Sequence, residues 1–175
     1  MVQMESNSEL GRGDAAPDFE LPGANGETYA LDDFETDALL IAFTCNHCPY
    51  AKAKIDLLNE LAAEYDDLAV VGINPNDAEE YPDDSYERMQ ERVAADEIRF
   101  TAYLRDESQE VAREYGAVCT PDPFLFERDG DAFRLAFHSR IDDAMSPDEE
   151  PEDYEMRTAV EALLDGHTDV MVGFV

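Results

Sequence analysis

The stretch "ALLIAFTCNHCPYAKAK" (residues 38–54) joins a six-residue apolar run to two cysteines, a proline and both lysines of the chain. An uninterrupted apolar run of this length is typical of a β-strand that is covered on both faces. Pro49 is favourable at the first position of a helix, so the stretch predicts a strand, a thiol-bearing turn and a helix. We therefore expect Cys45 and Cys48 at the carboxyl end of a buried strand, where open α/β sheets place their ligand sites.

A second apolar run, "LAVVGI" (residues 68–73), predicts a partner strand for the first. Between the two runs, apolar residues recur at helical spacing on an otherwise charged segment: Ile55, Leu58, Leu61, Ala62 and Tyr65. A strand, a helix and a second strand in this order form a parallel unit. The sequence therefore predicts an α/β fold.

Antiparallel hairpins are predicted on both sides of this unit. Two short half-apolar runs surround Gly23 to Gly26, which indicates a hairpin near the N-terminus. The segments "DPFLFE" and "DAFRLAFHSR" flank "RDG", which predicts a second hairpin added to the sheet. Residues 1–13 are polar and are expected to be a flexible lead, so that residues 14–175 form a single domain.

Three further helices and one loop complete the expected architecture. The segment "DDSYERMQERVAADE" predicts a helix on which Asp84 and Glu87 form a capping box. The segment "DESQEVAREYG" predicts a short helix that Gly116 ends. An acidic loop is expected at about residues 142–153, and an amphipathic helix at about residues 153–165.

The charge is extreme, with 43 acidic against 12 basic residues and a net charge of −31. The acidic residues are spread along the chain, a bias typical of proteins from organisms that keep molar salt in the cytoplasm, so we expect salt to stabilise this one. An acidic patch for a basic partner is the alternative. Such a charge argues against nucleic-acid binding. The sequence shows neither a signal peptide nor a membrane span, which predicts a cytoplasmic protein without membrane contact.

The three cysteines are Cys45, Cys48 and Cys119. An odd number in a reducing compartment argues against a static disulfide framework and favours a reactive or metal-binding pair. At a helix N-terminus the thiolate is stabilised, so we expect Cys45 to be the exposed, attacking thiol and Cys48 to resolve the mixed disulfide. His47, when protonated, would lower the thiol pKa further and make the disulfide comparatively oxidising.

A second motif is "YGAVCTPDPFLFERDG" (residues 115–130). A Thr-Pro pair directly before an apolar strand is a place where a cis peptide bond is plausible, and a cis proline is rarely incidental in a fold. Thr120 and Pro121 therefore become candidate site residues.

Taken together, the blocks "GDAAPDFELPGANGETYALDDF", "LLIAFTCNHC", "VVGINPND", "FTAYLRDESQEVAREYG" and "VCTPDPFLFERDG" resemble the AhpC/TSA and TlpA-like redoxins. The resemblance covers residues 13–140. It implies a thioredoxin-like fold, in which helices flank a central mixed β-sheet that carries an N-terminal β-hairpin extension. It also implies that Thr120 and a cis Pro121 face the cysteines and bind an extended substrate segment, and that Ser139 and Arg140 lie near the same groove. Thr44 and Asn46, which flank Cys45, are further candidate substrate-binding residues.

The sequence departs from this pattern at several positions. Neither Cys45 nor Cys48 is preceded by the proline and threonine of the peroxiredoxin signature. Thioredoxins have a tryptophan where this chain has Thr44, and a buried aspartate where it has Leu39. The usual proton acceptor is thus missing, which leaves His47, Lys52 or water to take up protons.

Four other residues also allow more than one interpretation. Cys119 is a small buried residue, or a third thiol that exchanges disulfides or binds a soft metal, as a histidine does in SCO-type copper proteins. Lys52 and Lys54 are solvated helix residues, or Lys52 adds positive potential beside the thiols. His138 lines a groove, or forms a surface pair that satisfies its ring.

The main hypothesis is a thiol-disulfide oxidoreductase that needs no cofactor and exchanges electrons with a protein disulfide or a low-molecular-weight thiol. One alternative is a thiol-dependent peroxide reductase, in which Cys45 forms a sulfenic acid and Cys48 condenses with it. The other is a metal-binding or copper-delivery protein that uses the three cysteines. The sequence predicts neither the direction of electron flow nor the oligomeric state.

Overall fold

A computed structural model of the chain describes residues 10, 11, 13–46, 54–117, 122–138 and 155–164. Residues 1–9 and 12 of the predicted lead at 1–13 lie outside this part of the chain, and so does the predicted acidic loop at about 142–153. None of the helices in the described part is long and apolar enough to cross a membrane.

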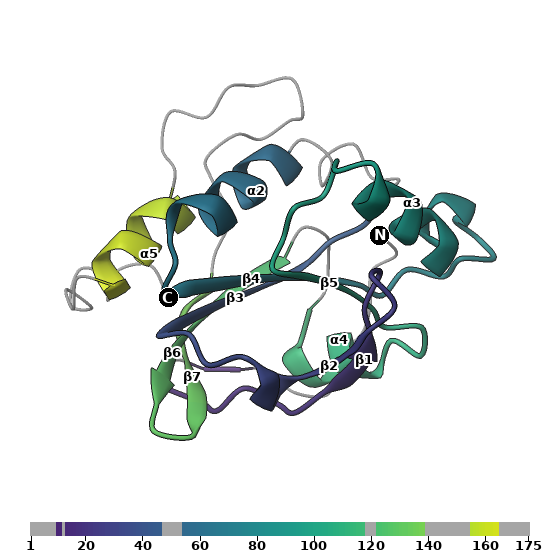
Figure 1. The fold of residues 1–175 in the computed structure, drawn as a ribbon. Helices are drawn as coiled ribbons and strands as arrows, with labels where there is room; N and C mark the ends of the chain where they lie inside the picture. The colour runs from purple at the N-terminus through teal and green to yellow at the C-terminus, as the bar shows by residue number, and fades with distance from the viewer. Residues whose placement is uncertain (1–9, 12, 47–53, 118–121, 139–154, 165–175) are drawn as a thin grey trace.

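A mixed five-stranded sheet forms the centre of the fold, in the order β5-β4-β3-β6-β7 (Figure 1). Its strands are β3 (Ala38–Phe43), β4 (Leu68–Asn74), β5 (Ala102–Arg105), β6 (Asp122–Asp129) and β7 (Ala132–His138). The pairs β3·β4 and β4·β5 are parallel, whereas β3·β6 and β6·β7 are antiparallel. The two apolar runs and the hairpin predicted from the sequence are therefore confirmed. We did not predict β5, which is only four residues long.

The predicted N-terminal hairpin is also present. It consists of β1 (Glu20–Pro22) and β2 (Thr28–Ala30), which pair antiparallel and lead into the 3₁₀ helix η1 (Leu31–Asp33). A bridge between Gly23 and Leu104 attaches the hairpin to the edge strand β5. The hairpin thus covers part of that edge, as the thioredoxin-like fold with an N-terminal extension implies.

The helices lie on both faces of the sheet (Figure 1). They are α2 (Ile55–Glu64), α3 (Tyr86–Ala94), α4 (Glu110–Tyr115) and α5 (Glu155–Leu164), with the 3₁₀ helix η2 (Pro82–Asp84) before α3. Helices α2 and α5 cover one face, and α4 and the hairpin lie on the other (Figure 1). Helices α3, α4 and α5 are present within a few residues of their expected bounds. Helix α2 contains the predicted periodic residues from Ile55 to Ala62, whereas its expected start at Pro49 lies outside the described residues.

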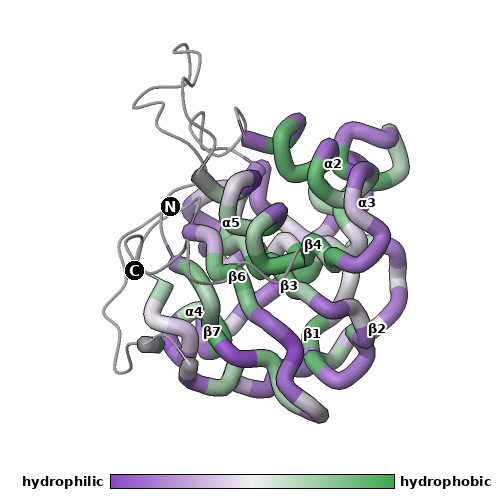
Figure 2. The backbone as a smooth tube through the Cα atoms, turned by 90° about the vertical axis from the view of Figure 1, so that its left-hand side faces the viewer, coloured by the Kyte–Doolittle hydropathy of each residue, from purple (hydrophilic) through white to green (hydrophobic). Residues whose placement is uncertain are grey.

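The alternation of side chains along β3 divides the core into two layers. Leu39 and Ile41 pack with α4 and the hairpin, while Leu40 and Ala42 pack with α2 and α5. All six residues of β3 have 0 % exposure, and the apolar tube of β3 and β4 runs through the middle of the molecule (Figure 2). The prediction that these strands are covered on both faces is confirmed.

One predicted capping arrangement is wrong. The N-cap of α3 is Ser85, whose Oγ accepts the backbone N–H of Arg88 at 3.2 Å. Asp84, the expected cap, has 0 % exposure and points elsewhere. Ser85 satisfies the helix end as well as an aspartate would, so the carboxylate of Asp84 takes part in other contacts. The predicted end of α4 is confirmed, because Gly116 adopts φ +74°, a left-handed conformation that suits glycine.

Candidate active site

Cys45 follows directly on the central strand β3. The backbone N–H of Thr44 still donates to the carbonyl of Ile73 at 2.8 Å, so the parallel pairing with β4 continues to the residue before the cysteine. Cys45 is therefore held at the carboxyl edge of the sheet, as the sequence predicted. It has 0 % exposure, however, whereas we expected an exposed thiol. Attack by this thiol requires the site to open.

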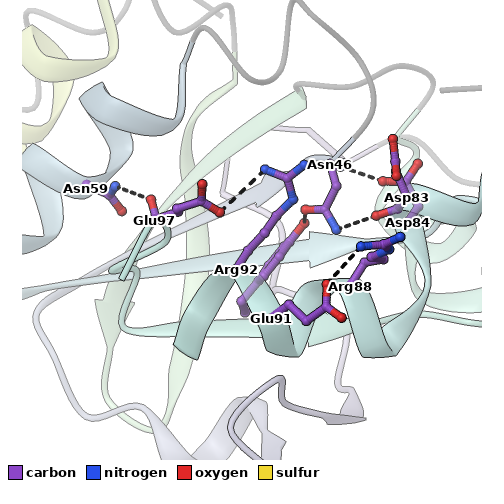
Figure 3. A network of polar contacts seen from close by, with 9 residues as sticks. Asn46, Asn59, Asp83, Asp84, Arg88, Glu91, Arg92 and Glu97 are labelled. Carbon is purple, nitrogen blue, oxygen red and sulfur yellow. Dashed lines mark hydrogen bonds and ion pairs between the residues drawn. The ribbon is translucent and has the colours of Figure 1, made fainter. Parts of the chain in front are cut away.

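The next residue, Asn46, uses its backbone N–H and its whole side chain in hydrogen bonds (Figure 3). Its N–H donates to Asp84 Oδ1 at 2.5 Å, and its Nδ2 donates to the carbonyl of Asp83 at 2.8 Å. Its Oδ1 accepts the hydroxyl of Tyr103 at 2.8 Å. These contacts tie the residue after Cys45 to η2 and to β5, elements that lie 37 to 57 residues further along the chain.

The carboxylate of Asp84 is the centre of this arrangement. Besides the N–H of Asn46, it accepts Asn74 Nδ2 at 3.2 Å and Asn76 Nδ2 at 2.9 Å. We call Asn46, Asn74, Asn76, Asp84 and Tyr103 the Asp84 cluster. All five residues are buried. Three N–H donors converge on one carboxylate, an arrangement that favours its ionised form.

The hydroxyl of Tyr103 is kept protonated in this environment. Burial raises its pKa most, the nearby charge of Asp84 raises it further, and a thiolate at Cys45 would add to the effect. The amide of Asn74 and the charge of Arg92 act in the opposite direction, but more weakly. Tyr103 is therefore a hydrogen-bond donor to Asn46 at any ordinary pH, and Cys45 lies within electrostatic range of the cluster.

Most of the predicted site residues lie outside the described part of the chain: His47, Cys48, Lys52, Cys119, Thr120, Pro121, Ser139 and Arg140. Their flanking strands are placed, however. Asp122, the first residue of β6, is the antiparallel partner of Phe43, the last residue of β3. The chain therefore enters β6 right beside the point where it leaves β3 toward Cys45. Two segments that are about 75 residues apart in sequence meet at one edge of the sheet.

Two predicted site residues within the described part of the chain, His138 and Lys54, are both at least partly enclosed by the protein. His138 Nε2 lies 2.6 Å from Asp122 Oδ1, and its ring stacks on Phe124 with a centroid distance of 3.9 Å. The ring is thus part of a satisfied pair, one of the two interpretations that the sequence allowed. Lys54 is only 4 % exposed, so its interpretation as a solvated helix residue is wrong.

Thr44 and Asn46 are both buried. Among the described residues, no hydrogen-bond partner lies near the hydroxyl of Thr44, while the polar atoms of Asn46 are all engaged within the protein. Direct contact of either side chain with a substrate stays a prediction. No group of three or more His, Cys, Asp or Glu side chains within the described ranges is arranged to hold a metal ion.

Sequence reasoning missed the Asp84 cluster. A signal for part of it was present, because Asn74 and Asn76 lie at the end of the apolar run 68–73. The carboxyl ends of neighbouring parallel strands meet at one edge, so polar residues after β4 belong beside those after β3. Nothing comparable indicated Asp84 or Tyr103, which come from η2 and from the unpredicted strand β5.

Comparison with known proteins is consistent with this arrangement. A hypothetical protein from Sinorhizobium meliloti is 40% identical, with a TM-score of 0.83, and the match covers 95% of this chain and 89% of that one. An uncharacterized conserved protein from Geobacillus kaustophilus is 39% identical, with a TM-score of 0.83 and coverage of 96% and 89%. No curated protein matches the sequence significantly.

More distant structures agree in fold. A protein described as the thiol:disulfide interchange protein DsbE of Chlorobium tepidum is 22% identical, with a TM-score of 0.65, and the match covers 91% of this chain and 99% of that one. At this identity the likeness concerns the thioredoxin-like fold alone. The model of the AhpC/TSA family matches residues 12–132, which include the hairpin, Cys45 and the start of β7. This chain is a member of the AhpC/TSA family.

Proposed function

We propose that the protein is a thiol-disulfide oxidoreductase in which Cys45 attacks and Cys48 resolves. One observation carries the proposal: Cys45 lies at the carboxyl end of the central strand β3, beside the start of β6, in a thioredoxin-like sheet. The second cysteine follows three residues later in the sequence. In the sequence, Thr120 and Pro121 come directly before β6, and the proposal assigns them to the substrate loop.

The reaction transfers two electrons to a disulfide of the substrate. The thiolate of Cys45 attacks one sulfur of that disulfide, the substrate S–S bond breaks, and the leaving thiolate takes up a proton. The thiolate of Cys48 then attacks the sulfur of Cys45, releases the second substrate thiol and leaves a Cys45–Cys48 disulfide. A thiol reductant restores the dithiol by the same exchange, so no cofactor is needed.

The remaining predicted residues support these steps. His47, when protonated, favours the thiolate of its neighbours. Thr120 offers its backbone to an extended substrate segment, and Pro121 shapes the loop. Because Cys45 is buried, the proposal includes a local opening of the site, so small thiol reagents should react with Cys45 faster than bulky ones.

The test compares the wild-type protein with Cys45→Ser and with Cys119→Ser as the matched control. Reduction of insulin disulfides is followed with dithiothreitol as the electron source. We expect Cys45→Ser to fall to the rate of dithiothreitol alone, and Cys119→Ser to keep its activity. Disulfide reduction that survives in Cys45→Ser overturns the proposal.

The same three proteins distinguish the alternative functions. Catalytic consumption of hydrogen peroxide that depends on Cys45 would identify a peroxide reductase. Stoichiometric copper, zinc or iron that is lost in Cys119→Ser would identify a metal-binding protein. Either result without disulfide reduction would replace the function proposed above.

A further inference from the structure

The Asp84 cluster places a buried carboxylate against the peptide bond that follows the attacking thiol. The Oδ1 of Asp84 lies 2.5 Å from the nitrogen of Asn46, and that nitrogen is separated from the sulfur of Cys45 by four covalent bonds. Standard bond lengths and angles then keep the sulfur and the carboxylate oxygen no more than about 8 Å apart. Both groups have 0 % exposure, so water screens their interaction little.

We infer that Asp84 is a positioning residue that fixes the Cys45–Asn46 turn and opposes ionisation of the Cys45 thiol. The inference rests on the proposed function for its meaning in catalysis. A negative charge at this distance disfavours a second one, so the carboxylate raises the pKa of Cys45. Asp84 thereby supplies a buried carboxylate beside the thiol, although Leu39 stands at the position where thioredoxins have a buried aspartate. Here the carboxylate comes from η2 and not from β3.

Other groups around the site act on the same thiol. Tyr103 on β5 is neutral, and Arg92 on α3 weakens the negative field of the cluster. Among the described residues, the neighbouring elements also carry charged or titratable groups: Lys54 before α2, Asp83 on η2, Arg105 and Asp106 at the end of β5, Asp122 on β6 and His138 on β7. In the range where a thiol titrates, Asp84 is the buried anion bonded to the turn itself.

The experiment measures the thiol pKa directly. In a Cys48→Ser, Cys119→Ser background, Cys45 is the single thiol, and its rate of alkylation by iodoacetamide is followed against pH. We expect Asp84→Asn, which keeps the shape but removes the charge, to lower the pKa of Cys45 by about one unit. The matched control is Asp83→Asn, which removes an equal charge from the exposed neighbouring side chain and should leave the pKa unchanged.

An unchanged or higher pKa of Cys45 in Asp84→Asn overturns the inference, and so does an equal decrease in Asp83→Asn. If circular dichroism shows that Asp84→Asn does not fold, Asp84→Ser takes its place, because serine is smaller, is neutral and can still accept the N–H of Asn46. Cys45 must then titrate at a lower pH in Asp84→Ser than in the background protein, and an unchanged or higher value rejects the role of Asp84. Alkylation does not require disulfide exchange. A pKa shift in a protein that reduces no disulfide would therefore reject the proposed function and keep this inference.

Discussion

Two buried clusters lie against the same sheet, an aromatic one on a face and a polar one at the carboxyl edge, and different interactions hold them together. On the face of α4, the rings of Phe43, Tyr115, Phe124 and Phe126 pack with centroid distances of 5.5 to 6.5 Å. The Asp84 cluster lies at the carboxyl edge of the sheet. Strand β5 contributes to both clusters' surroundings, since Leu104 packs with the aromatic side, while the adjacent Tyr103 packs its ring with Met89 and Ile98 and donates its hydroxyl to Asn46.

The clusters differ in whether their stabilising contacts are directional: apolar packing is not, whereas hydrogen bonds are. Burial of rings stabilises the fold through area and shape, and it tolerates small shifts. The Asp84 cluster depends on donors and acceptors that meet individually, and each loss leaves a buried polar group unsatisfied. The aromatic cluster should therefore determine global stability, and the polar cluster should determine the geometry and reactivity of Cys45.

The largest effect is expected in the aromatic cluster. Phe126→Ala removes a ring with 0 % exposure that contacts Tyr115 and Phe124. We expect a loss of about 3–5 kcal/mol in the free energy of unfolding. Urea denaturation measures it, and Phe126→Leu, which retains most of the apolar volume, should lose less than half as much. A loss under about 1 kcal/mol in Phe126→Ala would show that the rings do not dominate stability.

An intermediate loss of stability is expected at Gly72 on β4, against which the ring of Tyr103 packs. A methyl group at Gly72 would lie 2.8 Å from the ring of Phe100 and 3.0 Å from that of Tyr103. Gly72→Ala therefore forces both rings to move, and we expect it to cost about 1–3 kcal/mol in urea denaturation.

The matched control for this substitution is Gly11→Ala, where the nearest atom lies at an ordinary contact distance of 3.5 Å. That variant should stay within about 0.5 kcal/mol of the wild type. Equal losses in the two variants would mean that the close approach of Tyr103 to β4 has no energetic consequence.

The two clusters also differ in how far the sequence predicted them. The apolar runs 38–43 and 68–73 and the hairpin around "RDG" follow local patterns, and all of them were confirmed. Strand β5 was missed because four residues give too short a pattern, and its burial depends on pairing with β4. The fold of the aromatic side is thus largely encoded by periodicity.

The Asp84 cluster depends on choices that no local pattern determines. Both Asp84 and Ser85 are good N-caps, and only the packing of η2 against the sheet assigns the cap to Ser85. Asp84 then reaches a residue 38 positions earlier in the chain. The position of Cys45 could be predicted, since it follows from the strand β3. The burial of Cys45 and its neighbouring carboxylate could not.

The smallest loss of stability is expected on removal of a tyrosine hydroxyl. Each cluster contains one buried tyrosine, so the two substitutions compare the clusters directly. Tyr103 donates to Asn46 Oδ1 at 2.8 Å, and Tyr115 donates to the carbonyl of Pro17 at 2.6 Å. Tyr103→Phe and Tyr115→Phe should each lose about 0.5–1.5 kcal/mol in urea denaturation at pH 7. Only Tyr103→Phe should also change the alkylation rate of Cys45, because only that hydroxyl holds the residue after the thiol.

The pH dependence of these two variants follows from the same burial. Burial raises the pKa of both tyrosines above the ordinary value of 10.0, so the folded state favours the neutral phenol. This contribution is fully present below pH 10 and is lost as the pH rises above it, because the unfolded chain then releases protons that the folded chain retains. Each Tyr→Phe variant should therefore lose stability less steeply than the wild type above pH 10. If the unfolding free energy, measured by urea denaturation above pH 10, fell equally steeply in variant and wild type, the hydroxyl would not be buried and neutral. If the alkylation rate of Cys45 were unchanged in Tyr103→Phe, the Asp84 cluster would have no influence on the reactivity of the thiol.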